Sequence, residues 1–140
     1  MAKRLKGKVA LITGSSSGIG AGVAKAYARE GADIVLNYPD KAGERDIWEI
    51  QKAIEKMGRK ALVAKADVSD EGQVKRMVSQ ALKTFGKVDI LVNNAGHADR
   101  GAPLQDMSVE MFDRMIAVHL RGTFLCTKYV LPHMYKNDYG

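Results

Sequence analysis

The sequence predicts an α/β fold in which a doubly wound parallel sheet is covered by helices on both faces. Four short apolar segments begin at residues 9, 34, 61 and 88, so they recur every 25 to 27 residues. Apolar residues at helical spacing occupy the intervals between them. The apolar segments are continuous, which indicates strands that are buried on both faces, as in a parallel sheet. The repeating unit is therefore a strand followed by a helix.

The expected strands are the four apolar segments themselves. They are Val9–Ile12, Ile34–Leu36, Ala61–Ala64 and Val88–Val92. Parallel neighbours require right-handed crossover connections, and the segments between the strands are long enough to contain helices.

The first three expected helices each present one apolar face. Their apolar residues are spaced at i, i+3, i+4 or i+7, and they are Ile19, Val23, Ala26 and Tyr27, then Ile47, Ile50, Ile54 and Met57, then Val74, Val78, Ala81, Leu82 and Phe85. Glycines follow these helices where a left-handed residue is expected, namely Gly31, Gly58 and Gly86. Ser69, Asp70 and Glu71 are expected to start the third helix.

A fourth helix is expected to begin at Ser108 and to continue towards Pro132. It carries more apolar side chains than one sheet face requires, which suggests a neighbouring helix or subunit. These side chains are Phe112, Met115, Ile116, Phe124 and Leu125. The fourth strand is apolar on both faces, so if it lies at a sheet edge we expect a further strand to cover it.

Length and composition describe one globular domain. The chain has 140 residues, of which 46% are hydrophobic and 27% charged, and this excludes a disordered or collagen-like protein. No apolar run approaches the roughly 20 residues of a membrane helix, and Val9–Ile12 is too short for a signal peptide. The single Cys126 has no disulfide partner. We expect a cytoplasmic protein without a membrane partner.

The net charge of +6 would suit nucleic acid or an anionic ligand. The basic residues are scattered over expected helix surfaces, without a cluster and without interleaved aromatic residues. We therefore expect no nucleic-acid partner. His97 and His133 have no metal-ligand spacing with each other or with carboxylates, so no metal site is expected either.

A glycine-rich loop, Thr13-Gly14-Ser15-Ser16-Ser17-Gly18-Ile19-Gly20, joins the first strand to the first helix. Unpaired backbone N–H groups and the positive end of a helix dipole meet at such a position. Gly14 is expected to form the tight turn, Gly18 to let a pyrophosphate approach, and Gly20 to bring the helix near the sheet. The three serines would add hydroxyl donors. The alternative is a loop that only turns the chain, but a strand before it and a helix after it are the context of a dinucleotide site.

Four motifs in the expected order resemble the classical short-chain dehydrogenase/reductase family. They are the TGxxxGxG element at residues 13–20, Asp67-Val68, Asn93-Asn94-Ala95-Gly96, and Val118–Phe124 in place of the pattern V-N-L-x-G-x-F. The resemblance covers essentially the whole chain. It implies a Rossmann-like sheet with strand order 3-2-1-4 that continues beyond this chain. Residues 1–140 would then be the NAD(P)-binding, N-terminal part of a longer single domain.

The resemblance also implies a set of cofactor-binding residues. Asp67 and Val68 would lie against the adenine, while Ala95 and Gly96 would let the ribose and nicotinamide lie close. Structural alternatives remain, because Asp67 could cap the next helix with Ser69, and Asn93 would chiefly support the strand end. The implied set is Gly14, Ser15, Ser16, Ser17, Gly18, Ile19, Gly20, Tyr38, Asp67, Val68, Asn93, Ala95 and Gly96.

The family's chemistry implies hydride transfer, with a serine and a tyrosine that is followed four residues later by a lysine. The lysine matters because an unperturbed phenol, with a pKa near 10, is a poor acid-base catalyst at neutral pH. This sequence contains no YxxxK. His119 occupies the position of the family's catalytic asparagine. It either holds a water in a proton relay or forms a structural hydrogen bond within a helix pair.

The choice between NAD and NADP is expected just after the second strand. An acid there binds the ribose hydroxyls of NAD, whereas a basic residue accommodates the phosphate of NADP. Tyr38 stands where the family's acid would be, and Pro39 stands where its arginine would be. Lys41 and Arg45 could supply positive charge, while Asp40 could reach a ribose only if the loop bends back. The sequence favours NADP.

The predicted function is that of an NAD(P)-dependent oxidoreductase acting on a small secondary alcohol or ketone, with this chain as its cofactor-binding half. The alternative is a non-catalytic module that senses or sequesters a dinucleotide. The resemblance further implies a homo-oligomer, a homotetramer, that associates through the fourth helix. Expressed alone, residues 1–140 are expected to be poorly soluble or oligomeric, and inactive.

Overall fold

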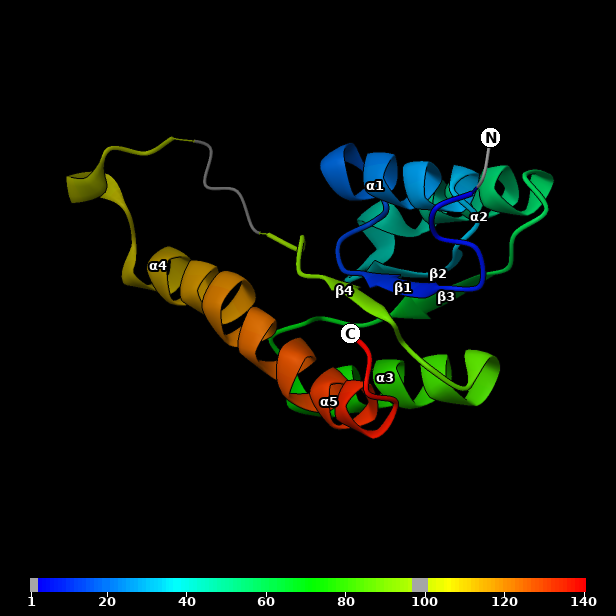
Figure 1. Cartoon of the computed structure of the whole chain (residues 1–140). Coiled ribbons are helices and arrows are strands. Elements are labelled where there is room, and N and C mark those ends of the chain that lie inside the picture. The colour runs from blue at the N-terminus through cyan, green and yellow to red at the C-terminus, as the bar shows by residue number, and fades with distance from the viewer. Residues whose placement is uncertain (1–2, 97–100) are drawn as a thin grey trace.

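The computed structural model describes residues 3–96 and 101–140, and these form a four-stranded parallel sheet flanked by helices (Figure 1). The strands are β1 (Val9–Ile12), β2 (Asp33–Tyr38), β3 (Ala61–Lys65) and β4 (Ile90–Val92). Their order is β3-β2-β1-β4, and each neighbouring pair is parallel. The predicted fold class and strand order are confirmed.

Two pairs of helices cover the two faces of the sheet. Helices α1 (Gly18–Arg29) and α2 (Glu44–Lys56) lie on one face, and α3 (Glu71–Phe85) and α5 (Gly122–Lys136) lie on the other (Figure 1). Helix α4 (Val109–Ile116) precedes α5 and extends beyond the sheet (Figure 1). No helix within the described ranges is both long and apolar enough to cross a membrane.

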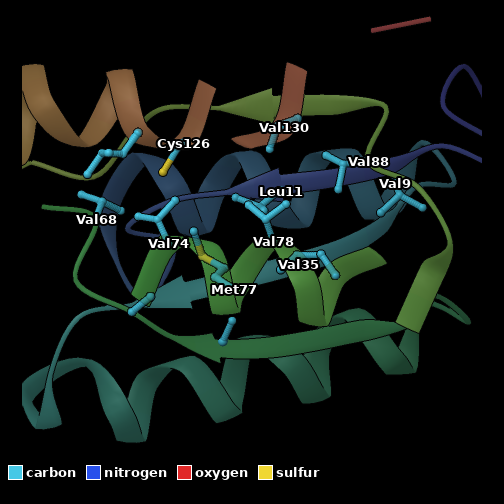
Figure 2. Close-up of a cluster of buried hydrophobic side chains, with 14 of the residues drawn as sticks. Val9, Leu11, Val35, Val68, Val74, Met77, Val78, Val88, Cys126 and Val130 are labelled. Atoms are coloured by element: carbon cyan, nitrogen blue, oxygen red, sulfur yellow. The ribbon is translucent and has the colours of Figure 1, made fainter. Parts of the chain in front are cut away.

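The sheet separates two hydrophobic clusters because alternate residues of a strand point to opposite faces. Val9 and Leu11 of β1 pack with Met77 of α3 and Val130 of α5 (Figure 2). Their neighbours Ala10 and Ile12 belong to the cluster beneath α1 and α2. The strands are thus buried on both faces, as their continuous apolar runs predict.

The expected helix boundaries are largely confirmed. Gly86 ends α3 with a φ of 76°, and Gly31 and Gly58 follow α1 and α2 with φ values of 98° and 76°. The side chain of Asp70 caps α3 by accepting a hydrogen bond of 2.8 Å from the N–H of Gln73. Ser69 does not cap this helix, because its hydroxyl bonds Asp67 instead.

Strand β4 is shorter than expected. It begins at Ile90 and not at Val88, because the Asp89 carboxylate accepts a hydrogen bond of 2.8 Å from the Val9 N–H. The Asp89 side chain thus binds the Val9 N–H, while the backbone N–H of Asp89 still donates to the Val9 carbonyl at 2.9 Å. Among the described residues β4 pairs with β1 alone, and its opposite edge is unpaired.

The fourth expected helix is interrupted and longer than predicted. Ser108 caps α4 as expected, with its hydroxyl accepting from the N–H of Met111 at 3.1 Å. A π-helical segment, η3 (Ala117–Arg121), then joins α4 to α5, and α5 continues past Pro132 to Lys136. Proline removes one backbone donor, and the packing of α5 against the sheet and α3 outweighs that loss.

Candidate functional site

A cavity of about 730 Å³ opens at the carboxyl edge of the sheet. Its walls come from the loops that follow β1 and β2, from the ends of β3 and β4, and from α4 and η3. In open α/β sheets this edge is where ligands bind, because the loops that follow the strands converge there.

The floor of the cavity is the glycine-rich loop, whose backbone leaves no room for side chains at two positions. Gly14 has a φ of 61°, and a Cβ built on it would lie 2.7 Å from the Cα of Ala95. A Cβ on Gly20 would lie 2.5 Å from Nδ2 of Asn94. Gly18 also has a positive φ, of 54°, but apart from its two chain neighbours and the backbone of its own helix, no described atom would lie within 4 Å of its Cβ. The loop is thus pressed against the end of β4, with open space beside Gly18.

A buried asparagine fixes this loop to the sheet. The side chain of Asn37 accepts from the N–H of Gly14 at 3.0 Å and donates to the carbonyls of Ala64 and Ala66 at 3.2 and 2.9 Å. The backbone N–H of Asn37 donates to the hydroxyl of Ser15 at 2.8 Å. Ser15 is fully buried in this network. It is therefore not a free hydroxyl donor, which corrects the expectation for this serine, whereas Ser16 and Ser17 line the cavity.

A second set of polar contacts joins the loop to β4. The hydroxyl of Thr13 accepts from the N–H groups of Asn94 and Ala95 at 3.0 and 2.9 Å. Asn94 Nδ2 donates to the carbonyls of Thr13 and Gly14, each at 3.0 Å. Asn93 lies outside the cavity lining, and its amide donates to the hydroxyl of Thr127 at 3.2 Å. The structure therefore does not bring Asn93 into the cavity lining, and its contact with a cofactor stays a prediction.

The loop after β2 bends back over the glycine-rich loop. The 3₁₀ turn η1 (Lys41–Gly43) is capped by Asp40, and a Cβ on Gly43 would lie 2.7 Å from the hydroxyl of Ser16. This bend brings Asp40 and Asp46 into the cavity wall. The sequence analysis expected Asp40 to reach a ribose only if this loop bends back, and the loop does bend back.

Tyr38 is a core residue and not a wall of the cavity. Its side chain is 4% exposed and packs in the cluster beneath α1 and α2, because it is the last residue of β2 and points into that face. Burial, and to a smaller extent the charge of Glu44, raises the pKa of its hydroxyl. The structure therefore does not bring Tyr38 into the cavity lining, and contact between Tyr38 and a cofactor stays a prediction.

At the end of β3, a carboxylate, a hydroxyl and a guanidinium form a closed network. Asp67 Oδ1 accepts from the backbone N–H and the hydroxyl of Ser69, at 2.9 and 2.6 Å. Arg114, from α4, donates to Asp67 Oδ2 at 2.8 Å and to the Ser69 hydroxyl at 2.9 Å. Burial alone would raise the pKa of Asp67, but the bonds from Ser69 and Arg114 outweigh it and hold that pKa below its ordinary value.

Another part of the cavity wall is formed by η3. A Cβ on Gly96 would lie 2.7 Å from Cε1 of His119, so the imidazole covers the backbone at that point. Val68 lines the cavity and packs against α5, since a Cβ on Gly122 would lie 2.6 Å from its Cγ2. No group of three or more potential metal ligands gathers within the described parts of the chain. His97 lies outside the described residues.

The structure thus brings together most of the residues that the sequence singled out. Those that line the cavity are Gly14, Ser16, Ser17, Ile19, Asp67, Val68, Ala95, Gly96 and His119. Arg114 and Asn37 were missed. Arg114 could have been found from the sequence because it lies one helical turn before Val118 and therefore on the same helix face. Asn37 could have been found because it is a polar residue at the end of an apolar strand.

Comparison with known proteins places these features in a family. A family model described as short chain dehydrogenase matches residues 8–140. Glucose 1-dehydrogenase 2 of Bacillus subtilis is 41% identical over 139 residues, which are 99% of this chain and 53% of that protein. The uncharacterized oxidoreductase YxbG of the same organism is 43% identical over 134 residues, 96% of this chain and 48% of that protein. The chain spans about half the length of these relatives.

Solved structures agree with this. The crystal structure of NAD⁺-bound xylitol dehydrogenase superposes with a TM-score of 0.92 at 32% identity, covering 99% of this chain and 52% of that one. A short chain dehydrogenase from Burkholderia cenocepacia in complex with NADP superposes with a TM-score of 0.86 at 37% identity, covering 93% and 52%.

Proposed function

Since this chain belongs to the short-chain dehydrogenase family, we propose that it forms the dinucleotide-binding part of an NAD(P)-dependent oxidoreductase acting on a secondary alcohol or ketone. The observation that carries the proposal is the cavity above the glycine-rich loop. There the start of α1 meets a backbone that excludes a Cβ at Gly14 and Gly20. Such a cradle suits a pyrophosphate, because backbone N–H groups and the helix dipole both favour a bound anion.

The residues present fit the rest of a dinucleotide as well. The loop from Gly14 to Ile19 would hold the pyrophosphate, and the walls at Asp40 and Asp67 would hold the adenosine half. Ala95 and Gly96 are small enough to admit the nicotinamide half beside His119. The nicotinamide would supply hydride transfer when bound, while the chain's own residues orient it.

We further propose that NAD is preferred to NADP, which reverses the preference expected from the sequence alone. Neither Lys41 nor Arg45 lines the cavity, and Arg45 lies beside Asp46 with an N–O distance of 3.7 Å. Among the described residues, the charged groups that the segment after β2 contributes to the cavity lining are the carboxylates of Asp40 and Asp46. Carboxylates accept hydrogen bonds from ribose hydroxyls and repel a 2′-phosphate.

Calorimetric titration of the intact protein with NAD and with NADP tests this preference. NAD should bind about tenfold more tightly or better. The variants Asp40→Asn and Asp46→Asn should narrow the difference by improving NADP binding. If the wild-type protein prefers NADP, the proposal that Asp40 and Asp46 select NAD is wrong, while the proposal that the cavity binds a dinucleotide still stands.

The test of dinucleotide binding is a pair of substitutions at Ser17, which lines the cavity and is exposed. Ser17→Glu places a negative charge beside the proposed pyrophosphate and should weaken binding by about 100-fold or more. Ser17→Gln has nearly the same shape without the charge and should bind much more tightly than Ser17→Glu. If Ser17→Glu and Ser17→Gln bind NAD with the same affinity, and NADP with the same affinity, the proposed pyrophosphate site is contradicted.

Oxidation of secondary alcohols, followed by NADH or NADPH absorbance, tests the enzymatic part of the proposal in the intact protein. Dinucleotide binding without turnover of any alcohol or ketone would support the non-catalytic module instead. We propose the cytoplasm as the compartment because the one cysteine of this sequence, Cys126, is a buried free thiol, as is usual in reducing compartments.

A further inference from the structure

The two helices on one face of the sheet carry a marked excess of positive charge. Helices α3 and α5 contain five lysines and arginines and one acidic residue, whereas α1 and α2, on the other face, contain five and four (Figure 1). The basic residues of α3 and α5 are Lys75, Arg76, Lys83, Lys128 and Lys136. The fold thus gathers on one side basic residues that are scattered along the sequence.

The one acidic residue of α3 and α5, Glu71, is already engaged. Its carboxylate accepts hydrogen bonds from the hydroxyl of Tyr129 and from Nζ of Lys128, the latter at 3.4 Å, and these bonds hold the pKa of Glu71 below its ordinary value. Lys75 and Lys83 form no ion pair with any carboxylate in the described parts of the chain. Neither of these two charges is therefore neutralised by a direct contact.

A second cavity, of about 530 Å³, lies between α3 and α5. Its polar lining consists of Lys75, Ser79 and Lys83 from α3, and of Tyr129 and His133 from α5. Nζ of Lys75 lies 5.2 Å from the centre of the Tyr129 ring, so this ammonium group reaches from α3 towards α5. No carboxylate of the described residues lines this α3–α5 cavity, which is therefore suited to an anion.

The spacing of the donors indicates the shape of that anion. Lys75, Ser79 and Lys83 are four residues apart and lie along one side of α3. Successive members are about 6 Å apart along the helix axis, because each residue of an α-helix rises by about 1.5 Å. Two ammonium groups with a hydroxyl between them match a chain of linked phosphate groups better than one compact anion, since each lysine can pair with a different phosphate.

We propose that the α3–α5 cavity binds a ligand with two or three linked phosphate groups, which pair with Lys75 and Lys83 and accept a hydrogen bond from Ser79. His133 can donate one further hydrogen bond. Leu82 adds apolar surface to the lining, which suits the organic part of a phosphate ester. This cavity shares no lining residue with the one above the glycine-rich loop, so the inference is independent of the proposed function.

Calorimetric titration of the intact protein with inorganic tripolyphosphate and with uridine triphosphate tests this site. Saturating NAD is present to occupy the other cavity, and the salt concentration is about 150 mM. At least one probe should bind with a dissociation constant below about 100 μM. Tighter binding of uridine triphosphate identifies an organic ester as the ligand, whereas tighter binding of tripolyphosphate identifies the inorganic chain.

The double variant Lys75→Gln with Lys83→Gln should weaken binding of the better probe by about 100-fold, about tenfold for each lost charge. Lys75→Arg with Lys83→Arg retains both charges and should retain binding. The matched control is Lys52→Gln with Lys56→Gln, which removes the same charge from exposed positions on α2 and should bind as wild type does. An equal loss in the control and the Lys75/Lys83 glutamine variant, or a wild-type dissociation constant above about 1 mM for both probes, would show an adventitious ion only and overturn the inference.

Discussion

At the scale of single residues, the site depends on buried polar side chains whose hydrogen bonds are made inside the protein. Asn37 is 1% exposed, and its amide bonds the loop after β1 and the carbonyls of β3 and the residue beyond it. Thr13 joins the same loop to the end of β4. A buried polar group without a partner is costly, so these bonds hold the loop in one conformation. A preorganised loop loses little entropy when a ligand binds.

His119→Asn is expected to preserve turnover of the intact enzyme within about tenfold, or about 1.4 kcal/mol of barrier. Either side chain can hold one water through a single polar atom, and the shorter Asn leaves more room beside Gly96. Steady-state kinetics with the best alcohol substrate provide the measurement. A loss of several hundredfold would show instead that the imidazole has a dedicated catalytic function.

The stabilisation from Asp67 should depend on pH. Its folded pKa lies below the ordinary value of 3.8, so its contribution is fully present above about pH 5 and is lost as the pH falls through the lowered folded value. Wild-type protein should therefore exceed Asp67→Asn in free energy of unfolding at neutral pH, and the gap should shrink below pH 3.8. Urea titrations without ligand measure both proteins. A gap that stays constant with pH would argue against an ionised Asp67 in the network.

At the scale of elements, the segment from α4 to α5 matters most to the site. A π-helical turn contains one residue more than an α-helical turn, because its hydrogen bonds join residues i and i+5. A continuous α-helix would therefore present a different set of side chains to the cavity. The π-helical segment η3 contains both Val118 and His119, which line the cavity. Such π insertions are frequent at functional sites.

The contribution of the Asp70 cap to the stability of helix α3 can be tested by substitution. Asp70→Ala removes the side-chain acceptor for the Gln73 N–H and should cost about 1 kcal/mol of unfolding free energy. Asp70→Asn keeps an equally good cap and should be nearly neutral. Chemical denaturation compares the three proteins. If alanine and asparagine destabilise equally, the effect is one of charge at the helix start and not of the cap.

At the scale of the whole molecule, one face of the α4–α5 arm is apolar and exposed. This face consists of four large apolar residues on α4, η3 and α5, each between 43% and 66% exposed. They are Phe112, Ile116, Leu120 and Phe124. Exposed apolar patches of this kind mark interaction sites in soluble proteins. We propose that a second copy of the chain covers this face, as the family resemblance implies.

The double variant Phe112→Glu with Phe124→Glu should therefore shift the intact protein towards a smaller assembly, because burying two carboxylates in an apolar interface is unfavourable. Sedimentation velocity over a range of concentrations measures the shift. Trp48→Glu changes another partly exposed aromatic residue, on α2, and should leave the assembly unchanged. An identical sedimentation profile for wild type and double variant would rule out association through this face.

The sequence by itself determined the strands, the first three helices and the position of the glycine-rich loop, and the family resemblance implied the strand order. Periodicity and capping are local properties, so Val9–Ile12, Asp70 and Gly86 could be assigned from their neighbours alone. Gly14 and Gly20 could be assigned in the same way, because a strand-to-helix turn restricts its own backbone.

The tertiary structure alone decided which side chains face the cavity. Tyr38 and Asp40 are two residues apart, yet packing under α1 and α2 buries the first, while the bend at η1 brings the second into the wall. Asp67 and Arg114 are 47 residues apart, and only the packing of α4 beside the end of β3 pairs them. Contacts between distant segments depend on how the elements pack, and periodicity within each element contains no information about that.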